Sequence, residues 1–190
     1  MDDREVRRGL GQARGEFYTP AQVGKLGARL LEPEPGQDVY DPTCGSGGLL
    51  LQVLAETRRL HGDRARQITL FGQELTPETW AMARMNMLLH GAGGAATIVQ
   101  GDTLAAPAFL EGGQLRRFDL VIANPPFSLK NWGAETWTSD PWGRASCGVP
   151  PAASADFAWI QHMVASMRQG TGRLGVVMPH GVLFRGGTEF

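Results

Sequence analysis

Short apolar runs alternate along this chain with longer segments in which apolar residues recur at helical spacing. The runs are typical of buried strands, and the longer segments are typical of amphipathic helices. The predicted strands are residues 38–42, 68–74, 97–101, 118–123 and 173–178. The predicted helices are residues 21–31, 46–60, 77–90 and 154–168. Because strands that alternate with helices pair in parallel and are covered on both faces, the pattern predicts a doubly wound α/β fold with a mostly parallel sheet.

Size and composition fit one globular domain. Of the 190 residues, 42% are hydrophobic and 19% are charged, which is enough apolar content to bury a core. We expect residues 1–14, which are polar and unpatterned, to form a mobile arm, and residues 15–190 to form the domain. No stretch reaches the roughly 20 consecutive apolar residues that span a bilayer, and the charged N-terminus lacks an apolar signal segment. These features predict a cytoplasmic protein.

Charge and cysteine content limit the classes of partner and cofactor. The formal net charge is -1, so the chain lacks the strongly basic signature of a domain that binds nucleic acid by its bulk charge. A nucleic-acid substrate must therefore be argued from the residues of a site. The two cysteines, Cys44 and Cys147, stand outside any CxxC or His-flanked spacing, so we expect neither a metal site nor a disulfide.

A glycine-rich segment, DPTCGSGG, occupies residues 41–48 between the first predicted strand and the next helix. Glycines let the backbone approach a ligand closely, and the helix N-terminus that follows favours a negative or hydrogen-bond-accepting group. The same composition suits a tight strand-to-helix turn in any α/β protein, so both interpretations stay open at this point. The spacing G-x-G-G differs from the G-x-G-x-x-G of dinucleotide-binding proteins, which weakens a nicotinamide interpretation.

An acidic residue lies at the end of each of the next two predicted strands: Glu74 is the last residue of one, and Asp102 directly follows the other. Glu74 could accept hydrogen bonds from ribose hydroxyls, as in nucleoside-binding α/β folds, although a solvated glutamate is the commoner case. Asp102 could accept from an adenine amino group, with Leu104 packing on the ring. Because the carboxyl ends of parallel strands open onto one crevice, the glycine loop and these residues together predict a nucleoside-shaped pocket.

The sequence NPPF, residues 124–127, follows the fourth predicted strand. An ordinary proline turn is the alternative interpretation, but the neighbouring pocket favours a chemical role. An adenine amino group is a poor nucleophile because its lone pair is delocalised into the ring. The Asn124 side-chain oxygen and the Pro125 carbonyl could accept its two protons, and consecutive prolines would hold the carbonyls rigidly. Phe127 could stack on a base flipped out of the duplex, and methyl transfer of this kind needs no metal.

A long segment after this motif, residues 128–153, combines tryptophans with many glycine, proline, asparagine and serine residues. Loops of this length in a compact domain are usually functional or disordered. The tryptophans are Trp132, Trp137 and Trp142. Stacking on DNA, contact with a partner and packing of the loop itself are equal alternatives for them. Two histidines in the chain, His162 and His180, are expected to pack or to form hydrogen bonds rather than to act as bases.

Several motifs in a fixed order resemble those of one protein family. They are GEFYTP at 15–20, DPTCGSGG, GQE at 72–74, GDT at 101–103, NPPF, and GRLGVVMPHGVLFRGG at 172–187. The chain resembles the adenine-specific DNA methyltransferases, and most closely the modification subunit of type I restriction-modification systems. The resemblance implies the Rossmann-like fold of class I S-adenosylmethionine-dependent methyltransferases and activity on the N6 amino group of adenine in DNA. It also implies S-adenosylmethionine as cofactor, and DNA and the specificity and restriction subunits as partners.

The resemblance carries particular roles to matching residues of this chain. It implies that residues 18–20 close over the methionine end of the cofactor, that Asp41 holds its amino group, that Glu74 holds its ribose and that Asp102 holds its adenine. The expected catalytic residues are Asn124, Pro125, Pro126 and Phe127. The expected cofactor-binding residues are Phe17, Tyr18, Thr19, Pro20, Asp41, Pro42, Thr43, Cys44, Gly45, Ser46, Gly47, Glu74, Asp102, Thr103 and Leu104.

The chain also differs from the family pattern. Modification subunits of the resembled systems begin with a helical domain and continue beyond PHGVLFRGG, and this chain has neither segment. We therefore expect residues 15–190 to be a partial catalytic core, truncated at its C-terminal strands. Two other functions stay open: an amino-group methyltransferase that acts on protein glutamine or RNA, and a cofactor-binding scaffold module without independent activity.

Overall fold

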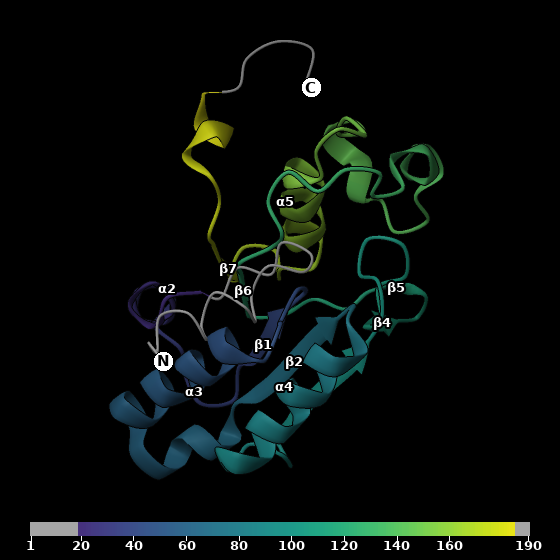
Figure 1. The fold of residues 1–190 in the computed structure, drawn as a ribbon. Coiled ribbons are helices and arrows are strands. Elements are labelled where there is room, and N and C mark those ends of the chain that lie inside the picture. The colour runs from purple at the N-terminus through teal and green to yellow at the C-terminus, as the bar shows by residue number, and fades with distance from the viewer. Residues whose placement is uncertain (1–18, 185–190) are drawn as a thin grey trace, which may run out of the picture.

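The computed structural model describes residues 19–184 and places five strands in one parallel sheet (Figure 1). The order across the sheet is β3-β2-β1-β6-β7. These strands are β1 (Asp38–Asp41), β2 (Thr69–Glu74), β3 (Ala96–Gln100), β6 (Leu120–Ala123) and β7 (Arg173–Val176). Tyr40 of β1 lies opposite Phe71 of β2 on one side and Val121 of β6 on the other. The prediction of a parallel sheet is confirmed, and β1 is its central strand.

The strands send alternate side chains to two separate cores, one on each face of the sheet. Val39 and Leu70 belong to the first core. The residues that follow them, Tyr40 and Phe71, belong to the second. Because both faces are covered, consecutive residues inside the strands are mainly apolar, such as Val39 and Tyr40 of β1, which explains the short apolar runs in the sequence.

Helices cover both faces, as a doubly wound fold requires (Figure 1). The first core is covered by α2 (Ala21–Leu31), α3 (Gly48–His61) and α4 (Pro77–Leu89). The second core is covered by α5 (Asp156–Ala165), which contributes Ala158, Trp159 and Met163. The predicted helices agree with these four to within a few residues at each end.

Short elements were not predicted, because they contain too few residues for a periodic signal. Two two-residue strands, β4 (Leu110–Glu111) and β5 (Gln114–Leu115), pair antiparallel. The 3-10 helices are η1 (Gly62–Gln67), η2 (Ala134–Ser139), η3 (Arg144–Cys147) and η4 (His180–Leu183). Two of them, η2 and η3, give structure to the segment 128–153.

The tryptophan-rich segment packs onto the second core. Trp132 and Trp137 are 6% and 2% exposed, and their rings meet edge to face with centroids 4.9 Å apart. The indole N–H of Trp132 donates to the Pro151 carbonyl at 3.1 Å, which closes the segment on itself. Of the three alternatives drawn from the sequence, packing of the loop accounts for these two tryptophans.

Other expectations from the sequence concern the termini, membranes and metals. Residues 1–14, Phe17 and Tyr18 lie outside the described residues. Within residues 19–184, no helix is long and apolar enough to cross a membrane. The same residues contain no group of three or more histidine, cysteine, aspartate or glutamate side chains placed to hold a metal ion. Cys44 is a buried free thiol and Cys147 an exposed one.

Candidate active site

A cleft of about 590 Å³ opens at the carboxyl ends of the strands. The chain runs outward from β1 to β2 and β3 and returns to β6 on the other side of β1. Such a switch in strand order leaves a crevice between the loops, where ligands bind in open α/β sheets. Of the predicted site residues, those that line the cleft are Thr19, Pro20, Asp41, Pro42, Thr43, Cys44, Gly45, Ser46, Glu74, Asp102, Thr103, Asn124, Pro125 and Pro126. The volume lies in the range of cofactor-sized pockets.

Glu74, at the end of β2, holds the glycine loop in shape. Its Oε2 accepts a hydrogen bond from the Gly45 N–H at 2.9 Å, and its Oε1 accepts one from the Thr76 N–H at 2.8 Å. Gly45 has a φ of +53°, a left-handed conformation that strains most side chains. Each carboxylate oxygen has a second lone pair that can accept from a hydroxyl in the cleft. Glu74 can therefore shape the loop and bind a ribose at the same time.

Asp41, at the end of β1, is an enclosed acidic side chain. It is 1% exposed, and its Oδ1 accepts a hydrogen bond from the Thr43 N–H at 3.0 Å. Burial raises the pKa of the Asp41 carboxyl from 3.8 to about 7; the Thr43 hydrogen bond opposes this rise, and the nearby Glu74 carboxylate adds to it. A cation bound beside Asp41 would favour the ionised carboxylate and would be attracted in turn, so the position suits an ammonium group.

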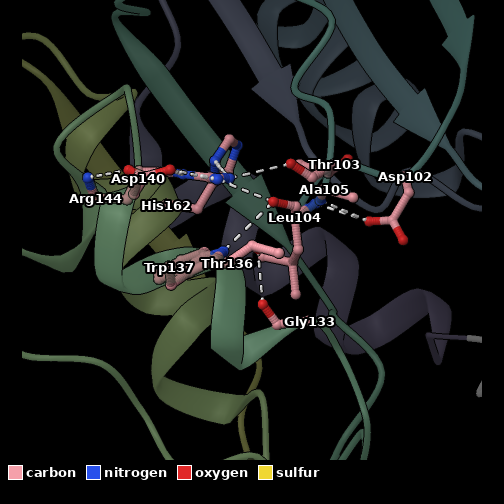
Figure 2. Close-up of polar contacts among 10 residues, drawn as sticks. All are labelled: Asp102, Thr103, Leu104, Ala105, Gly133, Thr136, Trp137, Asp140, Arg144 and His162. Atoms are coloured by element: carbon pink, nitrogen blue, oxygen red, sulfur yellow. Dashed lines mark hydrogen bonds and ion pairs between the residues drawn. The ribbon is translucent and has the colours of Figure 1, made fainter.

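The segment after β3 turns at the rim of the cleft. The Asp102 Oδ1 accepts hydrogen bonds from the backbone N–H groups of Leu104 and Ala105, at 2.9 and 3.1 Å (Figure 2). The Thr103 hydroxyl donates to the Pro42 carbonyl at 2.6 Å. These contacts tie the segment to the loop after β1 and leave the exposed Asp102 at the cleft.

Asn124, which follows β6, has one polar atom with a partner and one without. Its Nδ2 donates to the Thr19 hydroxyl at 2.9 Å. Its Oδ1 is buried and has no hydrogen-bond partner among residues 19–184. An unpaired buried acceptor costs about 1–3 kcal/mol, so an incoming N–H donor would be bound favourably there. Thr19 holds the amide so that its oxygen is the atom left for a ligand.

Among residues 19–184, three predicted site residues do not line the cleft. Leu104 is 2% exposed and lies in the second core, because the turn made by Asp102 directs it inward; its packing on an adenine ring stays a prediction. Gly47 has a φ of +83°, and a Cβ there would lie 2.5 Å from the Met87 Cε, so this glycine serves the packing of α3 against α4. Phe127 is half-buried, and its stacking on a base stays a prediction.

A buried network that was not predicted from the sequence joins the segment after β3 to the tryptophan-rich loop. Arg144 is 2% exposed and forms an ion pair with Asp140, with Nη2 2.7 Å from Oδ1. The same guanidinium donates to the carbonyls of Thr103, at 3.2 Å, and Leu104, at 2.9 Å (Figure 2). The wall of the cleft is therefore braced from behind by a loop that follows the NPPF motif.

His162 of α5 completes this network as a neutral side chain. Its Nδ1 lies 3.5 Å from the Arg144 Nη1, and its Nε2 lies 3.1 Å from the Tyr40 hydroxyl. Burial and the positive charge of Arg144 lower the pKa of His162 to about 3. Because an arginine can only donate, Nδ1 is the acceptor and the ring proton is on Nε2. The prediction that His162 forms hydrogen bonds rather than acting as a base is consistent with this geometry.

Further residues of the site carried little signal in the sequence. Met82 of α4 and Trp159 of α5 line the cleft, but each is a single apolar position on an amphipathic helix. Gln73 is different, because it is a polar residue inside a buried strand. Its side chain donates to the Ala106 carbonyl and accepts from the Ala108 N–H, which fixes the segment after β3. Buried polar side chains need such partners, so its position in the strand was a usable signal.

The fold and the cleft together define a class of protein. Helices on both faces of a parallel sheet, with acidic strand ends around the central crevice, form the fold of the class I S-adenosylmethionine-dependent methyltransferases. Within that class, the chain belongs to the N-6 DNA methylase family, whose profile matches residues 6–190.

Individual relatives agree with this assignment. The methylase subunit of the type I restriction enzyme HindI from Haemophilus influenzae is 33% identical over 174 residues, which cover 90% of this chain and 37% of the relative. The methylase subunit of MjaVII from Methanocaldococcus jannaschii is 35% identical over 182 residues, which cover 92% and 30%. A crystal structure of a type I restriction-modification methyltransferase subunit from Streptococcus thermophilus matches with a TM-score of 0.83 and 35% identity, over 98% of this chain and 40% of that one. The chain thus spans about a third of the length of the curated relatives it matches.

Proposed function

We propose that this chain is the catalytic core of a DNA methyltransferase that transfers a methyl group from S-adenosylmethionine to the N6 amino group of adenine, within a type I restriction-modification system. The observation that carries the proposal is the Asn124 side chain. Its Oδ1 is buried at the cleft without a partner among the described residues, and Thr19 holds its Nδ2. An acceptor placed in advance beside a cofactor-sized cleft suits an amino group whose lone pair must be freed for attack. Membership of the N-6 DNA methylase family supports the same reaction.

The polar groups of the cleft fit S-adenosylmethionine. We assign Asp41 to its ammonium group, because a buried carboxyl whose pKa is raised to about 7 gains from a neighbouring cation. Glu74 is assigned to the ribose hydroxyls and Asp102 to the adenine amino group, because both accept hydrogen bonds at neighbouring strand ends. We assign Thr19 and Pro20, which line the cleft, to the methionine end of the cofactor, and Thr19 also contacts Asn124.

When bound, the cofactor would supply a methyl group on a sulfonium: an N–C bond would form as the C–S bond breaks, a neutral thioether would leave, and the extra proton on nitrogen would pass to water. The Asn124 Oδ1 accepts one hydrogen of the adenine amino group, and the Pro125 carbonyl accepts the other. Both bonds draw the nitrogen lone pair out of conjugation with the ring, and they favour the positive charge that develops on nitrogen. The fixed φ of Pro125 and Pro126 keeps these acceptors in place, and Phe127 stacks on the extruded base.

Binding of DNA requires groups that this cleft does not provide. Among the described residues that line it there is no lysine, arginine or histidine, and the formal net charge of the chain is -1. Holding a duplex while a base is extruded takes cations that neutralise phosphates. We therefore propose that the specificity subunit supplies most of the contacts to DNA. We also propose that the restriction subunit joins the same complex and that this complex acts in the cytoplasm. Residues 1–190 alone should show no detectable DNA methylation.

The test uses the methyltransferase assembled with its specificity subunit, target DNA and methyl-labelled S-adenosylmethionine. Asn124→Ala should abolish methyl incorporation and leave the Kd for S-adenosylhomocysteine within about threefold, because the cofactor is held by other strands. Asp41→Asn is the matched variant for cofactor binding: unlike Asn124→Ala, it should weaken the binding of S-adenosylhomocysteine directly. Retained turnover in Asn124→Ala would overturn the role assigned to this residue, and label found only in protein or RNA would replace the proposed substrate.

A further inference from the structure

Arg144 begins the short 3-10 helix η3 of the tryptophan-rich segment and yet is almost fully buried. It is 2% exposed, and its guanidinium lies between two indole rings, 4.4 Å from the Trp137 centroid and 4.7 Å from that of Trp142. A buried arginine is costly unless its donors are used. Asp140 accepts from its Nε at 3.1 Å and from its Nη2 at 2.7 Å, which neutralises the charge. The role of Arg144 then depends on which groups accept hydrogen bonds from its other guanidinium N–H groups.

Besides the His162 Nδ1, those acceptors are two consecutive backbone carbonyls that precede the NPPF motif in the sequence. The Arg144 Nη1 donates to the Thr103 carbonyl at 3.2 Å, and Nη2 donates to the Leu104 carbonyl at 2.9 Å (Figure 2). The Trp137 Nε1 donates to the same Leu104 carbonyl at 3.4 Å. Side chains of the tryptophan-rich segment thus hold the backbone of residues 102–104 by hydrogen bonds on the side that faces away from the cleft.

The segment 102–104 is the one that carries Asp102. The Asp102 carboxylate is oriented by the N–H groups of Leu104 and Ala105, so its position depends on the path of the backbone that Arg144 holds. On the other side, the Thr103 hydroxyl is tied to the Pro42 carbonyl. A shift of the two carbonyls would therefore move the Asp102 side chain relative to the rest of the cleft.

We infer that Arg144 is a positioning residue for recognition of the adenosine half of the cofactor, and that it acts through the carbonyls of Thr103 and Leu104. The inference rests on the proposed function, since it concerns the cofactor assigned to this cleft. It also means that the loop after the catalytic motif and the adenine-binding wall form one unit. Loss of Arg144 weakens binding of the adenosine half, whereas loss of Asp41 weakens binding of the amino-acid half.

Arg116 provides a matched control for a general structural effect. It too forms an ion pair, with Nη2 2.8 Å from the Asp38 Oδ2, and its guanidinium lies 4.3 Å from the Phe71 ring centroid. Asp38 begins β1, at the end of the strand opposite to Asp41, so this arginine braces the sheet away from the cleft. Replacement of Arg116 also removes an ion pair and a cation–π contact, but it does not touch the segment 102–104.

The experiment measures the affinity of the full-length subunit for S-adenosylhomocysteine and for adenosine, by calorimetry and by competition. Arg144→Met combined with Asp140→Asn removes both charges and leaves no buried ion unpaired. This double variant should weaken both ligands by the same factor, about tenfold, which is the scale of one lost hydrogen bond to a charged group. Asp41→Asn should weaken S-adenosylhomocysteine and leave adenosine unchanged. Arg116→Met should lower the Tm and leave both affinities within about twofold.

Two results would overturn the inference: a double variant that binds both ligands as Arg116→Met does, or one that loses affinity for S-adenosylhomocysteine alone. If the double variant does not fold, Arg144→Lys serves instead. It keeps a charge beside Asp140 but cannot reach the carboxylate and both carbonyls together, so it should weaken both ligands about threefold. Unchanged affinities in Arg144→Lys would also overturn the inference. A wild-type protein that binds neither ligand would contradict the proposed cofactor instead, so the two failures are distinguishable.

Discussion

Replacement of Asp41 by asparagine should stabilise the protein above about pH 7 while it weakens cofactor binding. Asp41 is 1% exposed, and burial raises the pKa of its carboxyl from 3.8 to about 7. Between these values the folded state keeps a proton that the unfolded state releases. The free energy of unfolding of the wild type therefore falls as the pH rises through this window. Asparagine cannot ionise, so the free energy of unfolding of Asp41→Asn should not fall in this pH window.

The magnitude follows from the same pKa difference. The step from 3.8 to about 7 corresponds to roughly 4 kcal/mol once the pH is above both values. Water in the open cleft screens part of this cost, so we expect Asp41→Asn to exceed the wild type by about 2 kcal/mol at about pH 8. For a domain of this size that is about 4–8 °C in Tm. Near pH 4 the wild type and Asp41→Asn should have the same Tm.

Thermal melts across this pH range, with a calorimetric titration of S-adenosylhomocysteine, test both parts. Asparagine keeps an oxygen that can accept from the Thr43 N–H, so the comparison isolates the charge. Asp102→Asn is the control, because its carboxylate is exposed and its replacement should leave Tm unchanged. Affinity should fall about 10–100-fold in Asp41→Asn, the scale of a hydrogen bond to a charged group. A variant that is less stable than the wild type at about pH 8 would refute the reasoning.

Three other outcomes follow from the same geometry. Wild-type affinity for S-adenosylhomocysteine, titrated calorimetrically, should fall about tenfold per pH unit below about 7, because a protonated Asp41 cannot pair with an ammonium; Asp41→Asn should lack this dependence. Thr19→Val should lower kcat in the assembled complex about tenfold with the cofactor Kd nearly unchanged, because Asn124 loses its anchor, and Thr19→Ser should restore turnover. Gly45→Ala and Gly47→Ala should each destabilise by about 1–2 kcal/mol in denaturant melts, because both positions have a left-handed φ, and Gly47→Ala should cost slightly more because the Met87 methyl group must move aside; a smaller loss in Gly47→Ala than in Gly45→Ala would contradict the packing role.

The boundaries of the main elements were predictable because local residues mark them. The helix predicted at residues 21–31 is α2, and a glutamate with a φ of +45° follows its last residue, before the prolines of EPEPG. Pro77 begins α4 in its first turn, where a missing N–H costs nothing. The cleft was predictable for a topological reason. Residues such as Asp41 and Glu74 end parallel strands, and the carboxyl ends of such strands meet at one edge of the sheet.

The features that escaped prediction depend on contacts between distant parts of the chain. The direction of Leu104 is set by the Asp102 turn and by Arg144, which lies 40 residues further along the chain. No periodicity in the sequence connects an arginine of the four-residue helix η3 with two backbone carbonyls before the catalytic motif. The role of Gly47 in packing required the position of Met87 on a different helix. Local patterns thus place the strand ends correctly, whereas long-range packing decides which of the neighbouring side chains face the cleft.

The identity of the methylated atom is the most direct test of the function proposed for this chain. The complete complex would be incubated with its target DNA and methyl-labelled S-adenosylmethionine, and the DNA would be digested to nucleosides and separated by mass. We predict that the label lies on the N6 nitrogen of deoxyadenosine and disappears when Asn124 is replaced by alanine. Label on cytosine, or label on adenine that persists in the Asn124→Ala complex, would contradict the assignment of this site.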